Sequence, residues 1–181
     1  MTVTHRMLKA SAVLSALVTL SCDAPTTGPQ FDHATAHASY ATTSAGELSG
    51  LAKEVRQLSS RFNSTTQATK FGYVVGSPCV AAPGLGGMGF HWVNNGLVDP
   101  VFNPQQPEAV LYEPTKNGQL RFVAVEYIVI DVGQPAPTFD GHPFDVGGTP
   151  IPVPHWSLHV WVNKTNPNGL FTPFNPDVIC P

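Results

Sequence analysis

The chain has 181 residues, with 9 Lys or Arg against 12 Asp or Glu and a formal net charge of −3 at pH 7. Its basic residues do not cluster, which argues against a nucleic-acid partner. The length suits one domain with a hydrophobic core, and the sequence contains no internal repeat or coiled-coil heptad.

Residues 1–21 have the pattern of a secretory signal peptide. His5, Arg6 and Lys9 precede an apolar run over 10–20 that carries no charge. Such a run rises only about 16 Å as a helix, whereas the hydrocarbon core of a bilayer measures about 30 Å. The pattern therefore predicts export rather than a membrane span. Cleavage would leave seven basic and twelve acidic residues, a net charge of −5.

The break after the signal is Thr19-Leu20-Ser21-Cys22, which resembles the lipobox of bacterial lipoproteins. Thr19 departs from that pattern, which prefers an aliphatic residue there. The resemblance implies that Cys22 becomes the lipidated first residue of the mature protein and that the lipid anchors it to a membrane. The predicted location is the cell envelope outside the cytoplasm, and plain secretion is the alternative.

The other two cysteines, Cys79 and Cys180, predict a disulfide, because an exported protein matures in an oxidising compartment. The bridge would close a loop of about 100 residues and fasten the C-terminus. Two free buried thiols are the alternative. Cys79 acting as a nucleophile beside a histidine is a third, weaker hypothesis.

Residues 22–43 are rich in Ala, Thr and Pro without an apolar period, which predicts a flexible tether. The tether contains His33 and His37. A single globular domain is expected over 44–181. It should begin with an amphipathic helix over about 45–62, where Ser44 and Glu47 form a capping box. A second box over 64–67 predicts a short helical turn that Gly72 can close.

From residue 73 onward, runs rich in β-branched and aromatic residues alternate with Pro, Gly and Asn, which predicts strands and turns. The expected strands lie near 73–80, 88–93, 109–113, 120–131 and 156–163, and Asn117-Gly118 predicts a hairpin. Long loops are expected over 94–108 and 132–154. The predicted fold is α+β, with the N-terminal helix packed on a mainly antiparallel sheet that forms a sandwich or partial barrel.

Glu126 is the most informative polar residue of the longest expected strand. The two-residue period places it on one face with apolar neighbours: Phe122, Ala124, Ile128 and Ile130. A buried carboxylate is costly unless it is neutral, paired with a cation or bound to a metal. Glu126 therefore predicts either a structural ion pair or a site.

Three histidines lie on two other expected β segments. The same period puts His155, Ser157, His159 and Trp161 on one face of the last strand. Residues i and i+4 of a strand lie about 13 Å apart, so both histidines could bind one ion only if the strand bends. A glycine-rich run over 84–89 leads to His91. By itself His91 is more typical of a hydrogen-bonded core histidine.

Together these residues predict a divalent-metal site formed by His91, Glu126 and His159, with His155 as a further candidate ligand. The ligand types suit Zn, Mn, Fe or Cu. The compact His-x-His…Glu order of cupin barrels is absent, and no hydrolase, zincin or Cys-x-x-Cys motif is present. Second-layer or substrate contacts are expected from Tyr112, Glu113 and Tyr127, whereas His142 should face solvent.

Two alternatives need no metal. An envelope binding module could present aromatic residues to a glycan, a peptide or a small molecule, and the candidates are Trp92, Trp156, Trp161 and Phe171. A structural module would use its histidines and Glu126 only to satisfy each other.

Four sequence strings, SPCVAAPGLGGMGFHWVN, LYEP, LRFVAVEY and HWSLHVWVNKTNPNGLFTPFNP, are similar to a group of exported bacterial proteins of unknown function. The resemblance covers about 71–180 and implies one structural unit. It implies no activity.

Overall fold

The computed structural model describes residues 49–181, which belong to one compact unit. The predicted signal peptide, Cys22, the tether with its two histidines and the capping box at Ser44 lie outside the described residues. Among the residues that are described, no helix is both long enough and apolar enough to cross a membrane.

The helical segment precedes the sheet. Helix α2 (Gly50–Ser59) begins after Ser49, whose Oγ accepts a hydrogen bond from the Ala52 amide at 3.1 Å. One 3₁₀ turn, η1 (Ser60–Phe62), continues it. Helix α3 (Thr65–Lys70) has the predicted cap, because Ser64 Oγ accepts from the Gln67 amide. The predicted helix over 45–62 can thus be followed from Gly50 onward.

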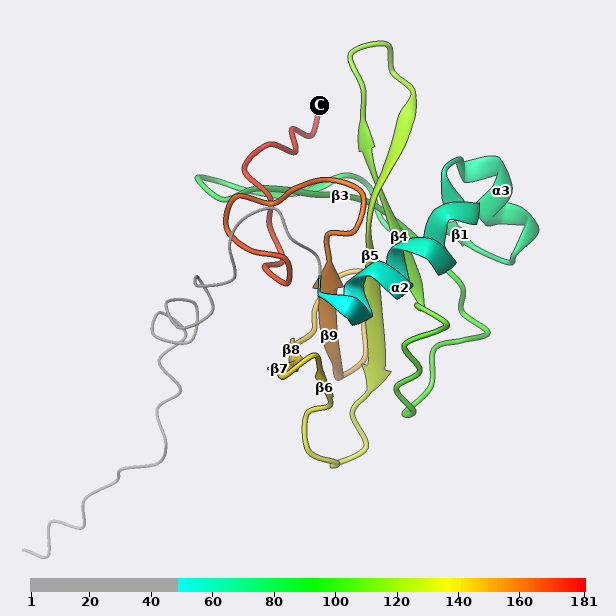
Figure 1. The fold of residues 1–181 in the computed structure, drawn as a ribbon, viewed down its shortest axis with the longest axis vertical. Helices are drawn as coiled ribbons and strands as arrows, with labels where there is room; N and C mark the ends of the chain where they lie inside the picture. The colour runs from blue at the N-terminus through cyan, green and yellow to red at the C-terminus, as the bar shows by residue number, and fades with distance from the viewer. Residues whose placement is uncertain (1–48) are drawn as a thin grey trace, which may run out of the picture. The chain divides into compact units, whose positions relative to one another are not determined.

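The strands form a mainly antiparallel sheet, as predicted. Seven strands have the order β1-β3-β4-β5-β9-β8, with β2 also paired to β3, and β6 and β7 form a separate two-stranded sheet. This order fits one main sheet rather than two facing sheets (Figure 1). The bounds are β1 Val74–Val75, β2 Val80–Ala82, β3 Gly86–Val93, β4 Ala109–Pro114, β5 Leu120–Ile130, β6 Thr138–Phe139, β7 His142–Pro143, β8 Asp145–Val146 and β9 His155–Val160.

The predicted strands agree with these bounds except at three places. The strand expected over 73–80 is interrupted, because β1 and β2 are separate strands on either side of 76–79. The last strand ends at Val160, three residues earlier than expected. The loop over 132–154 contains three short strands that its proline-rich sequence did not indicate. The predicted hairpin at Asn117-Gly118 joins β4 and β5, and Gly118 has a φ of 73°.

Both faces of the main sheet are buried. On the first, the helix face, α2 crosses β5 and β9 (Figure 1). There Ala52, Val55 and Phe62 belong to the same apolar cluster as Val125 and Tyr127 of β5. The opposite face, the C-terminal face, carries Ala109 and Leu111 of β4, Ala124 and Ile128 of β5, and Trp161, and Val178 near the C-terminus packs with them.

A β-bulge corrects the predicted face of Phe122. Leu111 pairs with Ala124 but Tyr112 pairs with Phe122, so Val123 is an extra residue on β5. The alternation reverses there, and Phe122 joins the helix face while Ala124 and Ile128 stay on the C-terminal face. Sequence spacing by itself had placed Phe122 with Ala124, because it assumed an uninterrupted period of two.

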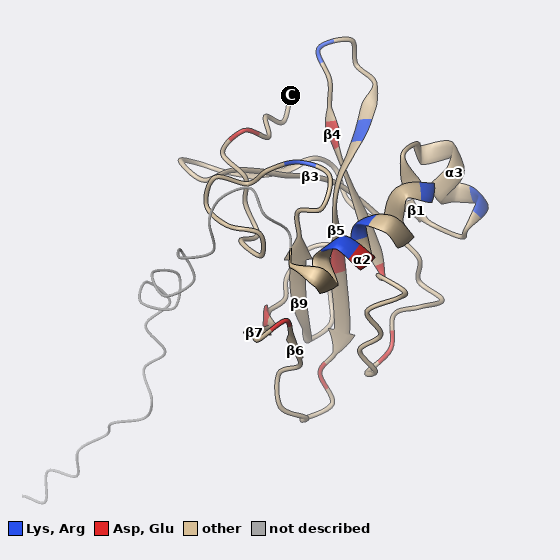
Figure 2. Ribbon diagram, viewed as in Figure 1, with Lys and Arg blue, Asp and Glu red and all other residues tan. Residues whose placement is uncertain are grey.

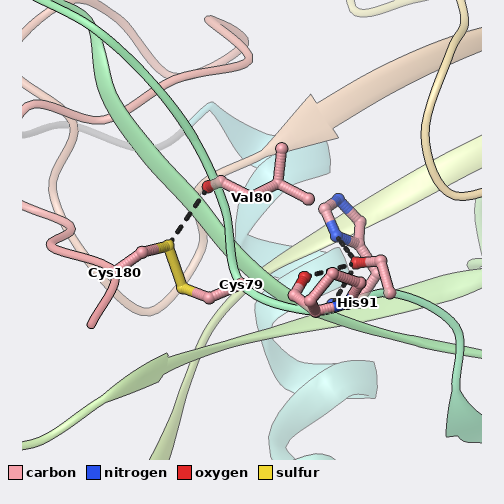
Figure 3. Close-up of a disulfide and its surroundings, with 6 residues drawn as sticks. Cys79, Val80, His91 and Cys180 are labelled. Carbon is pink, nitrogen blue, oxygen red and sulfur yellow. Dashed lines mark hydrogen bonds between the residues drawn. A yellow bond between two sulfur atoms is a disulfide. The ribbon is translucent and has the colours of Figure 1, made fainter.

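The predicted pairing of Cys79 with Cys180 is confirmed, since their Cα atoms lie 5.6 Å apart and their side chains are joined (Figure 3). Two backbone hydrogen bonds between Gly87 and Asn175 hold the same C-terminal segment against β3. Gly87 suits this contact, because a Cβ there would lie 2.9 Å from both the carbonyl oxygen and a side-chain carbon of Val178. The C-terminus is therefore part of the folded unit.

Two glycines of the glycine-rich run differ in how closely the backbone is packed around them. Gly89 has a φ of 98°, and a Cβ there would lie 2.4 Å from the Tyr112 carbonyl oxygen, whereas Gly84, with a φ of 77°, faces open space. Gly84→Ala should cost about 1–3 kcal/mol of unfolding free energy from backbone strain alone. Gly89→Ala should cost more, because the β3–β4 backbone must also move. Denaturant unfolding of both variants checks this; equal losses would contradict it.

Candidate metal centre

The register of the sheet brings His91, Glu126 and His159 together on the C-terminal face. Glu126 in β5 lies directly opposite His159 in β9 and, on its other side, opposite Ala109 in β4. His91 reaches from β3, where it pairs with Leu111. The small side chain of Ala109 leaves room above β4, so the longer side chains from β3 and β5 meet across it.

The distances in this triad fit an ion better than direct hydrogen bonds. Glu126 Oε2 lies 3.6 Å from His91 Nε2, and Glu126 Oε1 lies 4.0 Å from His159 Nε2. One ligand atom from each residue lies within 4.8 Å of the other two. Hydrogen bonds of this type would be about 2.7–3.2 Å. Ligands about 2.1 Å from a tetrahedral zinc are about 3.4 Å apart, close to the separation between Glu126 and His91.

The ligand atoms of the triad are buried and lack hydrogen-bond partners. His91 and Glu126 have relative accessibilities of 0 % and His159 of 2 %. By hydrogen-bond geometry neither Nε2 atom nor either carboxylate oxygen has a partner, although the Ser157 hydroxyl lies close enough to Glu126 to lower its pKa. Buried polar groups in folded proteins are normally paired, and an orphan group costs about 1–3 kcal/mol. An ion bound among these atoms, or a trapped water, would remove that cost.

Burial sets the protonation of all three residues. It lowers the pKa of His91 to about 4, and together with the neighbouring His91 it lowers the pKa of His159 to about 3. Burial also raises the pKa of Glu126 well above its usual value, opposed in part by the adjacent Ser157 hydroxyl. At neutral pH both imidazoles are therefore neutral, which is the form that binds metals. The raised pKa favours a protonated Glu126, and metal binding would displace such a proton.

The second ring nitrogen of His91, Nδ1, is hydrogen-bonded to a serine. This Nδ1 lies 2.9 Å from Ser77 Oγ, and Ser77 Oγ also donates to the Pro78 carbonyl at 2.8 Å. Figure 3 shows His91 with these contacts beside the disulfide. Ser77 is buried, at 5 % relative accessibility. Ser77 was not among the predicted site residues, because a serine in the expected first strand is not a specific signal.

The structure does not bring His155 into the triad. His155 pairs with Ile130, four residues beyond Glu126, and β9 runs from His155 to Val160 without a register shift. His155 Nδ1 contacts the Val153 carbonyl at 2.7 Å, and a Cβ on Gly147 would lie 2.1 Å from its Nε2. The bend that a shared ion would require is absent from this described strand, so His155 lies apart from the other two histidines.

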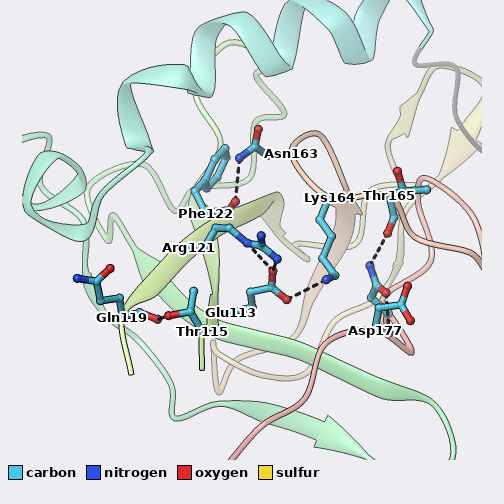
Figure 4. A network of polar contacts seen from close by, with 10 residues as sticks. Glu113, Thr115, Gln119, Arg121, Phe122, Asn163, Lys164, Thr165 and Asp177 are labelled. Atoms are coloured by element: carbon cyan, nitrogen blue, oxygen red, sulfur yellow. Dashed lines mark hydrogen bonds and ion pairs between the residues drawn. The ribbon is translucent and has the colours of Figure 1, made fainter. Parts of the chain in front are cut away.

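The expected second-layer residues have other roles. Tyr112 donates its hydroxyl to the Phe62 carbonyl and Tyr127 to the Pro104 carbonyl, so both anchor segments on the helix face. Glu113 pairs with Arg121 and, at 3.0 Å, with Lys164 (Figure 4). Figure 2 shows acidic and basic positions side by side on the two strands of the β4–β5 hairpin.

The remaining candidates are aromatic or lie near the surface. His142 is half-buried rather than solvent-facing, with its ring 4.1 Å from that of Phe171. Trp161 is buried, and its Nε1 donates to the Thr172 carbonyl. Trp92, Trp156 and Phe171 are half-buried and pack against the core of the helix face. The four aromatic residues therefore do not form one exposed surface.

Glu108 is a second buried acid near the triad that was not predicted from the sequence. Its Oε2 accepts from the Ile128 amide at 2.9 Å and so extends the β4–β5 pairing to the residue before the start of β4. Burial raises the pKa of Glu108 to about 8, with the Ile128 hydrogen bond opposing the shift. Its sequence signal was an acid immediately before the apolar run of β4, which is also typical of a solvated strand end.

Comparison with protein-family models, curated proteins and solved structures gave no match. The resemblance to exported bacterial proteins therefore remains a prediction, and the triad is the feature of this chain that indicates a function.

Proposed function

We propose that this protein is an exported, lipid-anchored protein of the cell envelope that binds one divalent metal ion through His91, Glu126 and His159. One observation carries the metal-binding part: three buried ligand atoms without hydrogen-bond partners converge within 4.8 Å. Two imidazoles and one carboxylate suit Zn²⁺, Mn²⁺, Fe²⁺ or Cu²⁺.

The donor set leaves a coordination position open. Catalytic zinc sites commonly have three protein ligands, whereas structural zinc sites usually have four. Within the described residues the metal-ligating group contains three members. An ion bound there could polarise a water or oxygen ligand in that fourth position. The buried faces of the main sheet would restrict such chemistry to water or a very small ligand.

The test of metal binding is stoichiometry. Protein freed of metal, incubated with zinc chloride and dialysed, should retain about one zinc ion per chain by elemental analysis. Glu126→Gln should retain essentially none, because the amide lacks the negative charge that compensates the ion in a buried site. The exposed Glu54 offers a matched control, and Glu54→Gln should retain as much zinc as the unmodified chain. Equal zinc content in both variants would rule out the site.

The envelope location rests on the sequence of residues 1–22. We expect the mature chain to start at Cys22 and to partition with membranes, because several acyl chains give durable anchoring. Cys22→Ala should release the protein or leave the precursor uncut. Mass spectrometry of the N-terminus and membrane fractionation check both outcomes. An unmodified mature N-terminus at another residue would contradict the lipoprotein assignment and favour plain secretion.

The aromatic binding surface has less support than the metal site. It requires Trp161 to be accessible, yet this side chain has a relative accessibility of 2 %. A structural role without metal would need a trapped water to satisfy the buried carboxylate and imidazoles, because at the observed separations they do not hydrogen-bond one another. For this reason we rank metal binding above both alternatives.

A further inference from the structure

We propose that Ser77 is a positioning residue for the metal site, holding His91 in the tautomer whose Nε2 lone pair faces Glu126. This inference rests on the proposed metal-binding function but is argued from the other side of the His91 ring. Ser77 is not expected to touch the ion, because it contacts the distal ring nitrogen, Nδ1.

The hydrogen bonds around Ser77 define the direction of each donor. A serine hydroxyl donates once and accepts up to twice. Ser77 Oγ donates to the Pro78 carbonyl at 2.8 Å, so its single proton is used. With the hydroxyl proton directed to Pro78, the ring donates the 2.9 Å contact between His91 Nδ1 and Ser77 Oγ. That arrangement places the His91 proton on Nδ1 and leaves a lone pair on Nε2.

The lone pair points at the rest of the triad. His91 Nε2 is the atom that lies 3.6 Å from Glu126 Oε2, and no group donates a hydrogen bond to it. In the other tautomer a proton on Nε2 would occupy this position and prevent coordination. Outer hydrogen bonds to metal-ligating histidines commonly fix the tautomer and ring orientation in this way.

Local structure keeps Ser77 in place. Its amide and that of Gly76 both donate to the His91 carbonyl, at 3.4 Å and 2.8 Å. Its hydroxyl also accepts from the His91 amide at 3.4 Å. Two residues later, Cys79 is bonded to Cys180. The segment between β1 and β2 thus turns the Ser77 side chain toward His91.

The affinity test uses zinc chloride and a competing chromophoric chelator. Ser77→Ala should weaken zinc binding about 10–100-fold, the usual loss when such an outer partner is removed. Ser77→Thr retains the hydroxyl and should recover most of the affinity. Ser59 provides the control, because it is buried at 1 % and its Oγ has no partner. Ser59→Ala should bind zinc as the unmodified chain does.

A second measurement determines the tautomer of His91 in the absence of metal. Long-range ¹H–¹⁵N NMR of the metal-free protein should show His91 protonated on Nδ1, and Ser77→Ala should move population to the form protonated on Nε2. Unchanged zinc affinity in Ser77→Ala, or a His91 already protonated on Nε2, would overturn the role of Ser77. If the unmodified chain binds no zinc, the proposed function fails. The NMR result still decides whether Ser77 sets the tautomer.

Discussion

Zinc added to the purified metal-free protein should raise its melting temperature, and Glu126→Gln or His159→Ala should each abolish this gain. A ligand that binds only the folded state stabilises it by RT ln(1 + [L]/Kd), about 2.7 kcal/mol at one hundred times Kd. Both variants remove a ligand atom from a site where three converge. They should still fold, because the apolar clusters on both faces remain.

Two controls separate site binding from general effects of zinc. His142→Ala removes a histidine outside the triad, and Glu54→Gln removes an exposed acid of α2. Both should keep the full zinc-dependent gain, even if their metal-free melting temperatures differ from that of the unmodified chain. A gain that persists in Glu126→Gln, or that is missing from the unmodified chain under saturating zinc, would contradict the proposed site.

Loss of the Cys79–Cys180 disulfide should cause the largest change in metal-free stability. The two cysteines are separated by 101 residues. In the chain-entropy model, removing a bridge that closes a loop of this length lowers the unfolding free energy by about 4.7 kcal/mol. The paired variant Cys79→Ser with Cys180→Ser should show this loss in denaturant unfolding, with the C-terminal segment becoming the most protease-sensitive part.

The paired variant avoids the free thiol that either single substitution would leave. Reduced and alkylated protein should unfold at the same denaturant concentration as the paired variant, because both lack the same constraint. Peptide mapping without reduction should recover one linked pair. Two cysteines that both alkylate readily in the native protein, together with unchanged stability of the paired variant, would contradict the bridge.

Much of the site could be predicted because it lies on long, regular strands. Glu126 stood alone among apolar residues at a period of two, and His159 stood on the polar side of an equally clear alternation. Both assignments hold, since β5 from Ala124 and all of β9 keep that alternation. The period-two rule is local, so it works wherever no residue is inserted into a strand.

The rule failed where pairing with a neighbouring strand determines local geometry. Phe122 changes face because Val123 has no partner of its own on β4. The first predicted strand is interrupted where the Gly76 and Ser77 amides both reach the His91 carbonyl. Neither irregularity is encoded in the spacing of one segment, because each depends on a register between two segments. The same dependence explains why Ser77 was not recognised.

The amino-acid sequence by itself determined the helical segment from Gly50 onward, most of the strands, the disulfide pair and the residue types of the candidate site. Only the tertiary structure decided which histidines meet Glu126. Register places His159 opposite Glu126 and His155 opposite Ile130, and Ala109 leaves room for His91 to reach across β4. Side-chain direction follows from local backbone period, whereas convergence of side chains depends on inter-strand register, which is a property of the assembled sheet.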